Sequence, residues 1–448
     1  MSEREDRKLM PLAKPQFLIG AAASGSGKTT FTMGLLRVLK RRGIDVQPFK
    51  CGPDYIDGKF HAIAAGRESV NLDTWLASEN HVRQVYARYA REASACVAEG
   101  VMGLFDGYDR MKGSSAGIAA LLNLPVIVVL NARSSAYTVA AILYGLKHFA
   151  PQVEVAGVIF NQVGSASHYS YLKEACADVG IADLGYLPKL PDIEVPSRHL
   201  GLTIGKASEI DALADRVADR IEQYVDVSRL LEISTRPLAT DNDCSAPSLH
   251  PSGEAARKRL TVAQDAAFNF IYKENLDVLS RKAEIVTFSP LAGDELPQTD
   301  YVYLPGGYPE FFVEELSRNV KLGEQLRDFA ANGGRLFAEC GGMMYLCREL
   351  ISRDGDSYPM AGVLPLTCTL EKMRLHLGYR TTHYRGMQLK GHEFHYSSVV
   401  RPDLLPSEVS QYNVKGAQVD TPLYRYKNVI AGYTHWYWGE NDFFKLWD

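Results

Sequence analysis

The sequence has no long apolar run. Its most continuous apolar stretch, LLNLPVIVVL, covers only ten of 448 residues, which is too short to cross a bilayer and suits a buried strand with its approach. The N-terminal stretch MSEREDRKLMPLAKP is charged and has no apolar core, so we do not expect a secretory signal. A membrane partner is therefore not expected.

The sequence also lacks a basic excess and paired cysteines. Lys and Arg total 49 against 53 Asp and Glu, without a basic run, so the charge does not favour a nucleic-acid partner. The seven cysteines are scattered and form no CxxC pair, which argues against a zinc ribbon or a disulfide framework. A reducing, cytoplasmic location fits this use of cysteine.

The pattern along the chain predicts two α/β domains joined by a linker. Residues 16–232 alternate buried-strand candidates with helical periodicity, which predicts a parallel sheet with helices on both faces. Residues 233–256 are rich in Ser, Pro, Asp and Ala without periodicity, and we expect a linker there. A second α/β pattern occupies residues 257–448, with strand candidates RLTVAQ, AEIVTFS, DYVYL and RLFAE.

A phosphate-binding loop follows the first predicted strand. AASGSGKTT matches the G-x-x-x-x-G-K-[ST] pattern except at Ala22, and a strand precedes it while a helix follows. Backbone N–H groups, a lysine and a hydroxyl there can hold nucleotide phosphates and Mg²⁺. The residues expected to contact ATP are Gly25, Ser26, Gly27, Lys28, Thr29 and Thr30.

Acidic residues follow the next two predicted strands. KCGPDYIDGKFH carries Asp54 and Asp57 on either side of Tyr55, and EGVMGLFDGYD carries Glu99 and Asp106. Ligands bind at the carboxyl ends of strands in an open parallel sheet, where carboxylates can hold Mg²⁺. Ordinary turn chemistry is the alternative reading of such loops. It does not suit Glu99, because a carboxylate in an otherwise apolar stretch is costly unless it is paired or binds metal.

One cysteine has the sequence context of a nucleophile. RLFAECGGMMYL places Cys340 between a predicted strand and a predicted helix, where a sharp turn can expose a thiolate. His435, in AGYTHWYWGE, is the candidate base. Gly306 and Gly307, in YLPGGYPE, follow another strand and can present N–H groups to an oxyanion. A buried structural thiol is the alternative, which we prefer for the other cysteines.

KGHEFHYSS contains two histidines, His392 and His395. Their H-E-x-H spacing differs from the H-E-x-x-H of zinc proteases, and no third ligand can be named from the sequence. We therefore expect a structural role for this segment.

Together the motifs resemble one family, the cobyrinic acid a,c-diamide synthases, which are glutamine-dependent amidotransferases of cobalamin biosynthesis. The resemblance extends from about residue 16 to 440, apart from the linker. It rests on SGSGKTT, QPFKCGPDYID, NLDTW, EGVMGLFDGYD, GVIFNQVGSASHY, SRHLGL, LPGGYPE, FAECGGMMYL and GHEFHYS.

The resemblance implies a first domain similar to dethiobiotin synthetase, which binds Mg-ATP and phosphorylates the a- and c-carboxylates of cobyrinic acid. It implies metal contacts from Thr29, Asp54 and Glu99 and substrate contacts from Tyr55 and Ile56. The catalytic residues that it implies for this step are Asp54, Asp57, Glu99 and Asp106. A nucleotide contact from Asn161 is also implied.

The second domain resembles a class I glutaminase of the cobalamin type, with a flavodoxin-like α/β fold. The resemblance implies that Cys340 attacks the glutamine amide, that His435 relays protons, and that ammonia passes to an acyl phosphate. The sequence His435-Trp436-Tyr437 lacks the acid of the usual His-x-Glu pair, so a third member of the triad stays open. Pairing of such domains favours a homodimer.

Three alternatives remain at this point. Ni-sirohydrochlorin a,c-diamide synthase uses the same machinery on another tetrapyrrole. Cobyric acid synthase shares the domains, although the GPDYID loop and short first domain fit the a,c-enzyme better. A P-loop switch ATPase is a rival of another class, and it would leave Cys340 and His435 without a purpose.

Overall fold

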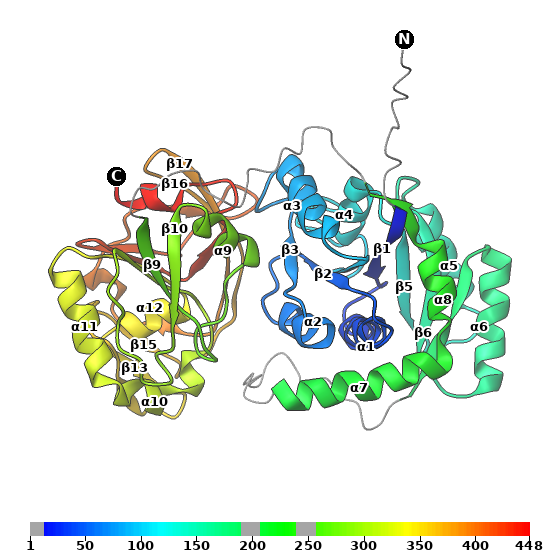
Figure 1. Cartoon of the computed structure of the whole chain (residues 1–448), viewed down its shortest axis with the longest axis horizontal. Helices are drawn as coiled ribbons and strands as arrows, with labels where there is room; N and C mark the ends of the chain where they lie inside the picture. Colours follow the sequence, from blue (N-terminus) through cyan, green and yellow to red (C-terminus); the bar gives the residue numbers. More distant parts are fainter. Residues whose placement is uncertain (1–12, 190–206, 239–256) are drawn as a thin grey trace, which may run out of the picture. The chain divides into compact units, whose positions relative to one another are not determined.

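A mostly parallel sheet forms the centre of the first unit in this computed structural model, which describes residues 13–189, 207–238 and 257–448 (Figure 1). Its strand order is β3-β2-β4-β1-β5-β6-β7, with β8 pairing antiparallel to β1. The strands are β1 (Ala13–Gly20), β2 (Val46–Cys51), β3 (Val70–Leu72), β4 (Ala95–Glu99), β5 (Val126–Asn131), β6 (Val155–Val163), β7 (Ala182–Pro188) and β8 (Thr235–Pro237).

Helices cover both faces of this sheet, as the alternating pattern predicts. Helices α1, α2 and α7 lie on one face, and α3 and α4 lie on the other (Figure 1). The helices are α1 (Lys28–Arg41), α2 (Asp57–Ala65), α3 (Glu79–Arg91), α4 (Ser115–Leu122), α5 (Val139–His148), α6 (Ala166–Val179), α7 (Ala207–Tyr224) and α8 (Val227–Ile233). Since β1 ends where α1 approaches, the loop between them lies at the carboxyl edge of the sheet.

The second unit also has a central, mostly parallel sheet, in the order β10-β9-β11-β12-β22-β21. These strands are β9 (Lys258–Ala263), β10 (Ala283–Phe288), β11 (Tyr301–Leu304), β12 (Arg335–Glu339), β21 (Leu423–Tyr426) and β22 (Val429–Gly432). Its helices are α9 (Lys273–Ser280), α10 (Val313–Arg318), α11 (Val320–Ala331) and α12 (Gly341–Leu346), with short turns η2 (Pro309–Phe311), η3 (Pro402–Leu404) and η4 (Phe443–Trp447). The predicted α/β class is confirmed for both units.

Two smaller sheets in the second unit were not predicted. One has the order β20-β19-β16-β17-β23 and is antiparallel, and the other has the order β14-β13-β15-β18. Their strands are β13 (Glu349–Ile351), β14 (Ser357–Pro359), β15 (Thr367–Thr369), β16 (His376–Tyr384), β17 (Met387–His395), β18 (Ser398–Val399), β19 (Gln411–Tyr412), β20 (Gln418–Val419) and β23 (Thr434–Trp436). Most of these strands have only two or three residues, which is too short for an alternating pattern of apolar and polar residues to reveal them.

The expected linker is only partly described. Thr235–Pro237, placed within it by composition, pairs with β1, while residues 239–256 lie outside the described residues. The described residues form two compact units, one made mostly of residues 13–238 and the other mostly of residues 257–448.

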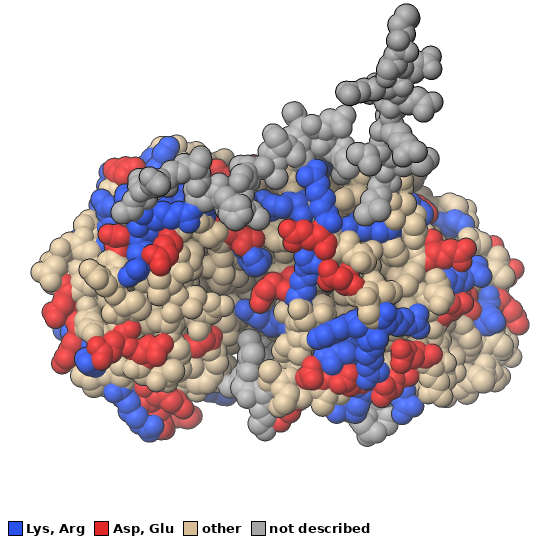
Figure 2. All heavy atoms as spheres, in the orientation of Figure 1, with Lys and Arg blue, Asp and Glu red and all other residues tan. Residues whose placement is uncertain are grey.

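Charged side chains of both signs are interspersed on the surface drawn in Figure 2. On the first unit, Arg41 of α1 forms ion pairs of 2.7 Å with both Asp215 and Asp219 of α7. Such exposed pairs are worth at most about 1 kcal/mol each, so the buried apolar faces of the helices dominate this packing. Across the described ranges, no helix is both long enough and apolar enough to cross a membrane.

Candidate active site

The phosphate loop of the first unit is held open by glycine conformations and by one asparagine. Gly25 and Gly27 have φ values of 76° and 95°, in the left-handed region. The Asn161 side chain donates to the Ser26 carbonyl at 2.9 Å. A Cβ at Gly27 would lie 2.1 Å from Asn161 Nδ2, so this position leaves no room for a side chain. Asn161 thus supports the loop backbone in this state.

The cation and hydroxyls of the loop lie at the start of α1. Lys28 Nζ donates to the Met102 carbonyl at 2.6 Å. Thr29 Oγ1 lies 2.8 Å from Glu99 Oε1 and 3.3 Å from Asp57 Oδ2. Asp57 and Glu99, predicted from separate segments, therefore both approach the Thr29 hydroxyl, which is the group predicted to bind Mg²⁺.

A buried lysine that sequence reasoning missed joins these carboxylates. Lys50 Nζ lies 2.7 Å from Asp57 Oδ2 and 2.8 Å from Glu99 Oε1. His61 Nε2 lies 2.6 Å from Glu99 Oε2. These four side chains are each at most 2% exposed, so the charges are paired within the protein.

The pairing fixes the charges of this cluster. Burial alone would raise the pKa of Glu99, but Lys50 and His61 lower that pKa well below its ordinary value. Burial alone would lower the pKa of Lys50, but the charges of Asp57 and Glu99 outweigh it and raise that pKa. The ammonium and the Glu99 carboxylate are therefore both ionised before any ligand binds.

The remaining predicted residues of this unit lie on the neighbouring loops. Asp54 Oδ1 accepts from the backbone N–H groups of Ile56 and Asp57 at 2.8 and 2.9 Å and so orders the start of α2. Tyr55, between them, is 8% exposed. Asp106 Oδ2 accepts from the Gly103 N–H at 2.9 Å on an exposed loop. Asp57, rather than Asp54, is the carboxylate that reaches Thr29.

In the second unit, Cys340 lies on a strained turn between β12 and α12. Its φ and ψ are 45° and −108°, an unusual conformation for a residue with a Cβ. Its N–H donates to the Gly432 carbonyl at 2.7 Å, and its carbonyl accepts from the Met344 N–H at 2.9 Å. The turn is therefore bonded on both sides, as expected for a nucleophile presented between strand and helix.

Gly306 brings Cys340 and His435 together. A Cβ at Gly306 would lie 2.1 Å from His435 Cε1 and 3.2 Å from Cys340 Cβ. Gly307 has a φ of 156°. A Cβ at Gly341 would lie 3.0 Å from the backbone nitrogen of Gly307. Three segments predicted separately thus converge, and only glycines allow them to approach so closely.

Both reactive groups are neutral in this state. Burial and the nearby Glu310 raise the pKa of the Cys340 thiol well above its ordinary value, against a small opposing effect of the Gly341 N–H. Burial, together with His392 and His395, lowers the pKa of His435 to about 3. A neutral imidazole beside a protonated thiol can act as its base once a substrate is present.

The sequence left a third acid open, and the structure places a buried carboxyl nearby. Glu339 Oε1 accepts from the Trp436 backbone N–H at 2.8 Å, and Oε2 accepts from the Tyr303 hydroxyl at 2.7 Å. Burial raises the pKa of Glu339 to about 8. The Glu339 carboxyl thus accepts a hydrogen bond from the backbone of β23, the strand that carries His435.

Two family models match the chain. The CobQ/CobB/MinD/ParA nucleotide-binding domain matches residues 17–202, and the CobB/CobQ-like glutamine amidotransferase domain matches residues 259–443. The first covers the phosphate loop and the carboxylate cluster, and the second covers Cys340, His435 and the glycine turn. Fold and sites together therefore define a glutamine amidotransferase fused to a nucleotide-binding domain.

Curated relatives match over most of their length. The hydrogenobyrinate a,c-diamide synthase of Brucella abortus is 42% identical over 86% of this chain and 90% of its own. The cobyrinate a,c-diamide synthases of Picrophilus torridus and Priestia megaterium are 38% and 35% identical over 95% and 96% of this chain, and over 96% and 95% of their own. The chain belongs to the cobyrinate and hydrogenobyrinate a,c-diamide synthase family, whose members are glutamine-hydrolysing ligases.

Proposed function

We propose that the chain amidates the a- and c-carboxylates of cobyrinic acid, using ATP to activate each carboxylate and glutamine to supply ammonia. The observation that carries this proposal is the presence of two distinct sites in one chain. One has paired charges beside a phosphate loop, and the other has a strained cysteine beside a histidine. Membership of the a,c-diamide synthase family supports the same reaction.

The metal content of the acceptor defines a second candidate. Relatives named for hydrogenobyrinate, the cobalt-free counterpart of cobyrinate, reach 42% identity, against 35–38% for relatives named for cobyrinate. This difference favours including hydrogenobyrinic acid as a substrate. The corrinoid names also favour a corrin over Ni-sirohydrochlorin. The match to an amidotransferase domain argues against a switch ATPase.

In the first unit, the proposed step is phosphoryl transfer. A carboxylate oxygen of the acceptor attacks the γ-phosphorus of ATP, the bond to the leaving oxygen breaks, and ADP departs. Lys28 and the loop N–H groups stabilise phosphate charge, while Tyr55 and Ile56 contact the acceptor and Asn161 the nucleotide or its loop. Asp54, Asp57, Glu99 and Asp106 act in catalysis by orienting these groups.

Mg²⁺ is the cation that fits this donor set. The Thr29 hydroxyl lies within reach of two carboxylates, and hard oxygen donors of this kind suit Mg²⁺. Thr29 and Glu99, with Asp54 or Asp57, would hold it. When bound, Mg²⁺ neutralises charge on phosphate oxygens. Lys50 Nζ pairs with both Asp57 and Glu99 and so orients the two carboxylates.

In the second unit, the proposed step is acyl transfer through a thioester. Cys340 Sγ attacks the amide carbon of glutamine, and His435 takes the thiol proton and gives it to the departing ammonia. N–H groups of Gly306 and Gly307 stabilise the oxyanion. Water then hydrolyses the thioester to glutamate, while ammonia attacks the acyl phosphate, whose phosphate leaves.

Mass spectrometry tests the acceptor. The protein is incubated with ATP, Mg²⁺, glutamine and, separately, cobyrinic acid, hydrogenobyrinic acid or Ni-sirohydrochlorin. Two amidations of a corrinoid acid, both absent without ATP, would support the proposal. Amidation of Ni-sirohydrochlorin alone would keep the chemistry and change the acceptor, and no amidation of any of the three would refute the proposed acceptor class.

A further inference from the structure

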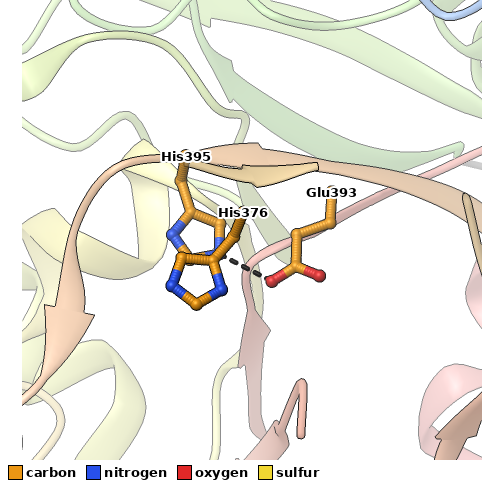
Figure 3. Close-up of side chains that lie close together, drawn as sticks. All are labelled: His376, Glu393 and His395. Carbon is orange, nitrogen blue, oxygen red and sulfur yellow. Dashed lines mark hydrogen bonds and ion pairs between the residues drawn. The ribbon is translucent and has the colours of Figure 1, made fainter. Parts of the chain in front are cut away.

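Glu393 and His395 form a buried pair on β17 to which the reaction above assigns no role (Figure 3). Glu393 Oε1 lies 2.7 Å from His395 Nε2, and the two residues are 2% and 7% exposed. The other carboxylate oxygen, Oε2, lies 2.6 Å from Arg380 Nε and 2.8 Å from the Thr421 hydroxyl. Both oxygens of Glu393 thus have partners: His395 on the same strand, and Arg380 on β16 together with Thr421.

A metal site is the first alternative for this cluster. Among the residues that the structure describes, His376, Glu393 and His395 have ligand atoms within 4.8 Å of one another. However, the rings of His376 and His395 stack face to face, with planes 1° apart and centroids 4.8 Å apart (Figure 3). In-plane lone pairs of such rings cannot converge on one ion at about 2.0–2.1 Å. Arg380 also holds Glu393 as an ion-pair partner.

His395 instead faces an oxygen on both sides of its ring. Its Nδ1 faces the Ser397 carbonyl at 2.8 Å, and its Nε2 faces the Glu393 carboxylate. Burial alone would raise the pKa of Glu393, but His395, Arg380 and Thr421 lower it to about 2, so this carboxylate is ionised. The Tyr433 ring stacks on the His395 ring, with ring centroids 3.5 Å apart.

The pair fixes two segments that contact the reactive groups. Phe394 lies between its two members, and the Phe394 carbonyl is 3.6 Å from Cys340 Sγ. On the neighbouring strand β23, Thr434 and His435 pair with Glu393 and His392. Tyr433, which stacks on His395, follows Gly432, whose carbonyl accepts from the Cys340 N–H. The side chains of the pair therefore hold backbone segments on both sides of the place beside Gly306 where Cys340 and His435 converge.

We propose that Glu393 and His395 are positioning residues of the glutaminase site, which set the placement of His435 and of the Phe394 carbonyl around the Cys340 thiol. This role rests on the proposed function of Cys340 and His435. It acts on glutamine hydrolysis alone, since neither residue belongs to the phosphate-loop unit. Because the two residues act as a pair, replacing either one should remove the positioning effect.

The test separates kcat from KM in glutaminase assays of Glu393→Gln, His395→Gln and the double variant. Each single variant should lower kcat by about tenfold to a hundredfold, since small misplacements of reacting groups have effects of this size. The KM for glutamine should change by less than about threefold if only positioning is lost. The double variant should lose no more than the poorer single variant.

Controls keep the outcome interpretable. Glu349→Gln removes a carboxylate of the same unit that also bonds two hydroxyls, Ser357 and Thr367, and it should keep the kcat of the parent. Thr421→Val deletes one donor to Glu393 with little change of shape and should lower kcat about fivefold. This milder variant carries the test if the buried substitutions prevent folding.

The results distinguish this inference from the proposed function beneath it. If Cys340→Ala still uses glutamine, the proposed nucleophile is wrong and the positioning role falls with it. If Cys340→Ala loses glutamine use while Glu393→Gln and Thr421→Val keep the parental kcat, only the positioning role is refuted. A rise in KM without a fall in kcat, or additive losses in the double variant, would also refute it.

Discussion

The two candidate sites have opposite electrostatics. In the first unit, Lys50 and Glu99 are ionised and buried, and Lys50 Nζ lies within 2.8 Å of carboxylate oxygens of both Asp57 and Glu99. In the second, Cys340 and His435 are both neutral and are brought together by backbone geometry. The first site thus contains ionised side chains before a substrate binds, whereas the two proposed reactive side chains of the second site are neutral.

The difference follows from the two proposed reactions. In phosphoryl transfer the negative charge is present throughout, so fixed cations and paired carboxylates need little reorganisation. In thioester formation the charges on sulfur and imidazole appear only as the amide is attacked. A strained turn at Cys340, with a φ of 45°, presents the thiol without requiring a free thiolate.

The largest expected effect comes from Lys28→Ala. Because Lys28 is the proposed cation at the transferring phosphate, amidation should fall about a thousandfold or more with glutamine or with ammonia. Product formation is measured with each nitrogen source, and glutamine hydrolysis is the control for the second unit. Normal amidation with ammonia would remove Lys28 from the phosphate site.

Cys340→Ala should separate the two sites. Glutamine-dependent amidation should be lost, because no thioester can form, while ammonia-dependent amidation should persist near the parental rate. Amidation is measured with glutamine and with ammonium at a fixed ATP concentration. Loss of both activities would mean that the variant has damaged more than the nucleophile.

Gly306→Ala should reduce glutaminase activity about a hundredfold, since misplacing reacting groups by about 1 Å has this effect. The added methyl would lie 2.1 Å from His435 Cε1 and must displace the ring. Gly323→Ala in the same unit is the matched control, because its Cβ would have ordinary contacts from 3.4 Å. Equal losses in the two variants would contradict the glycine contact.

The smallest expected effect concerns the free thiol. A pKa above the ordinary value leaves less thiolate at neutral pH, so iodoacetamide should alkylate Cys340 no faster than a free cysteine, and faster as the pH rises. Peptide mass mapping gives the rate at this position. Rapid, selective alkylation at pH 7 without glutamine would show that the thiolate is already formed, and the contrast between the sites would disappear.

Local sequence predicts what depends on local structure. The phosphate loop with its glycines, and the strand-to-helix turn at Cys340, are each coded within a few residues and lie where expected. Glu99 was recognisable because a carboxylate stood in an apolar strand. Lys50 gives the same signal, because it is a charged residue within the buried strand β2.

What the sequence hides depends on distant contacts. His61 becomes relevant only because α2 brings it to Glu99, and Glu393 only because β17 passes beside Cys340. Their neighbours in sequence give no indication of these partners. The short antiparallel strands of the second unit, and β8 within the expected linker, likewise depend on pairing across the fold. The assigned roles of the site residues remain predictions.

One measurement tests most directly whether the two sites act in series. The protein is incubated with a corrinoid acid, ATP and glutamine labelled with ¹⁵N in its amide, with unlabelled ammonium at a concentration too low to support amidation of its own. Mass spectrometry should find two amides in the product, both carrying ¹⁵N, with one ADP formed for each. Amides formed without ATP, or carrying the nitrogen of the bulk ammonium while glutamine stays intact, would contradict the account.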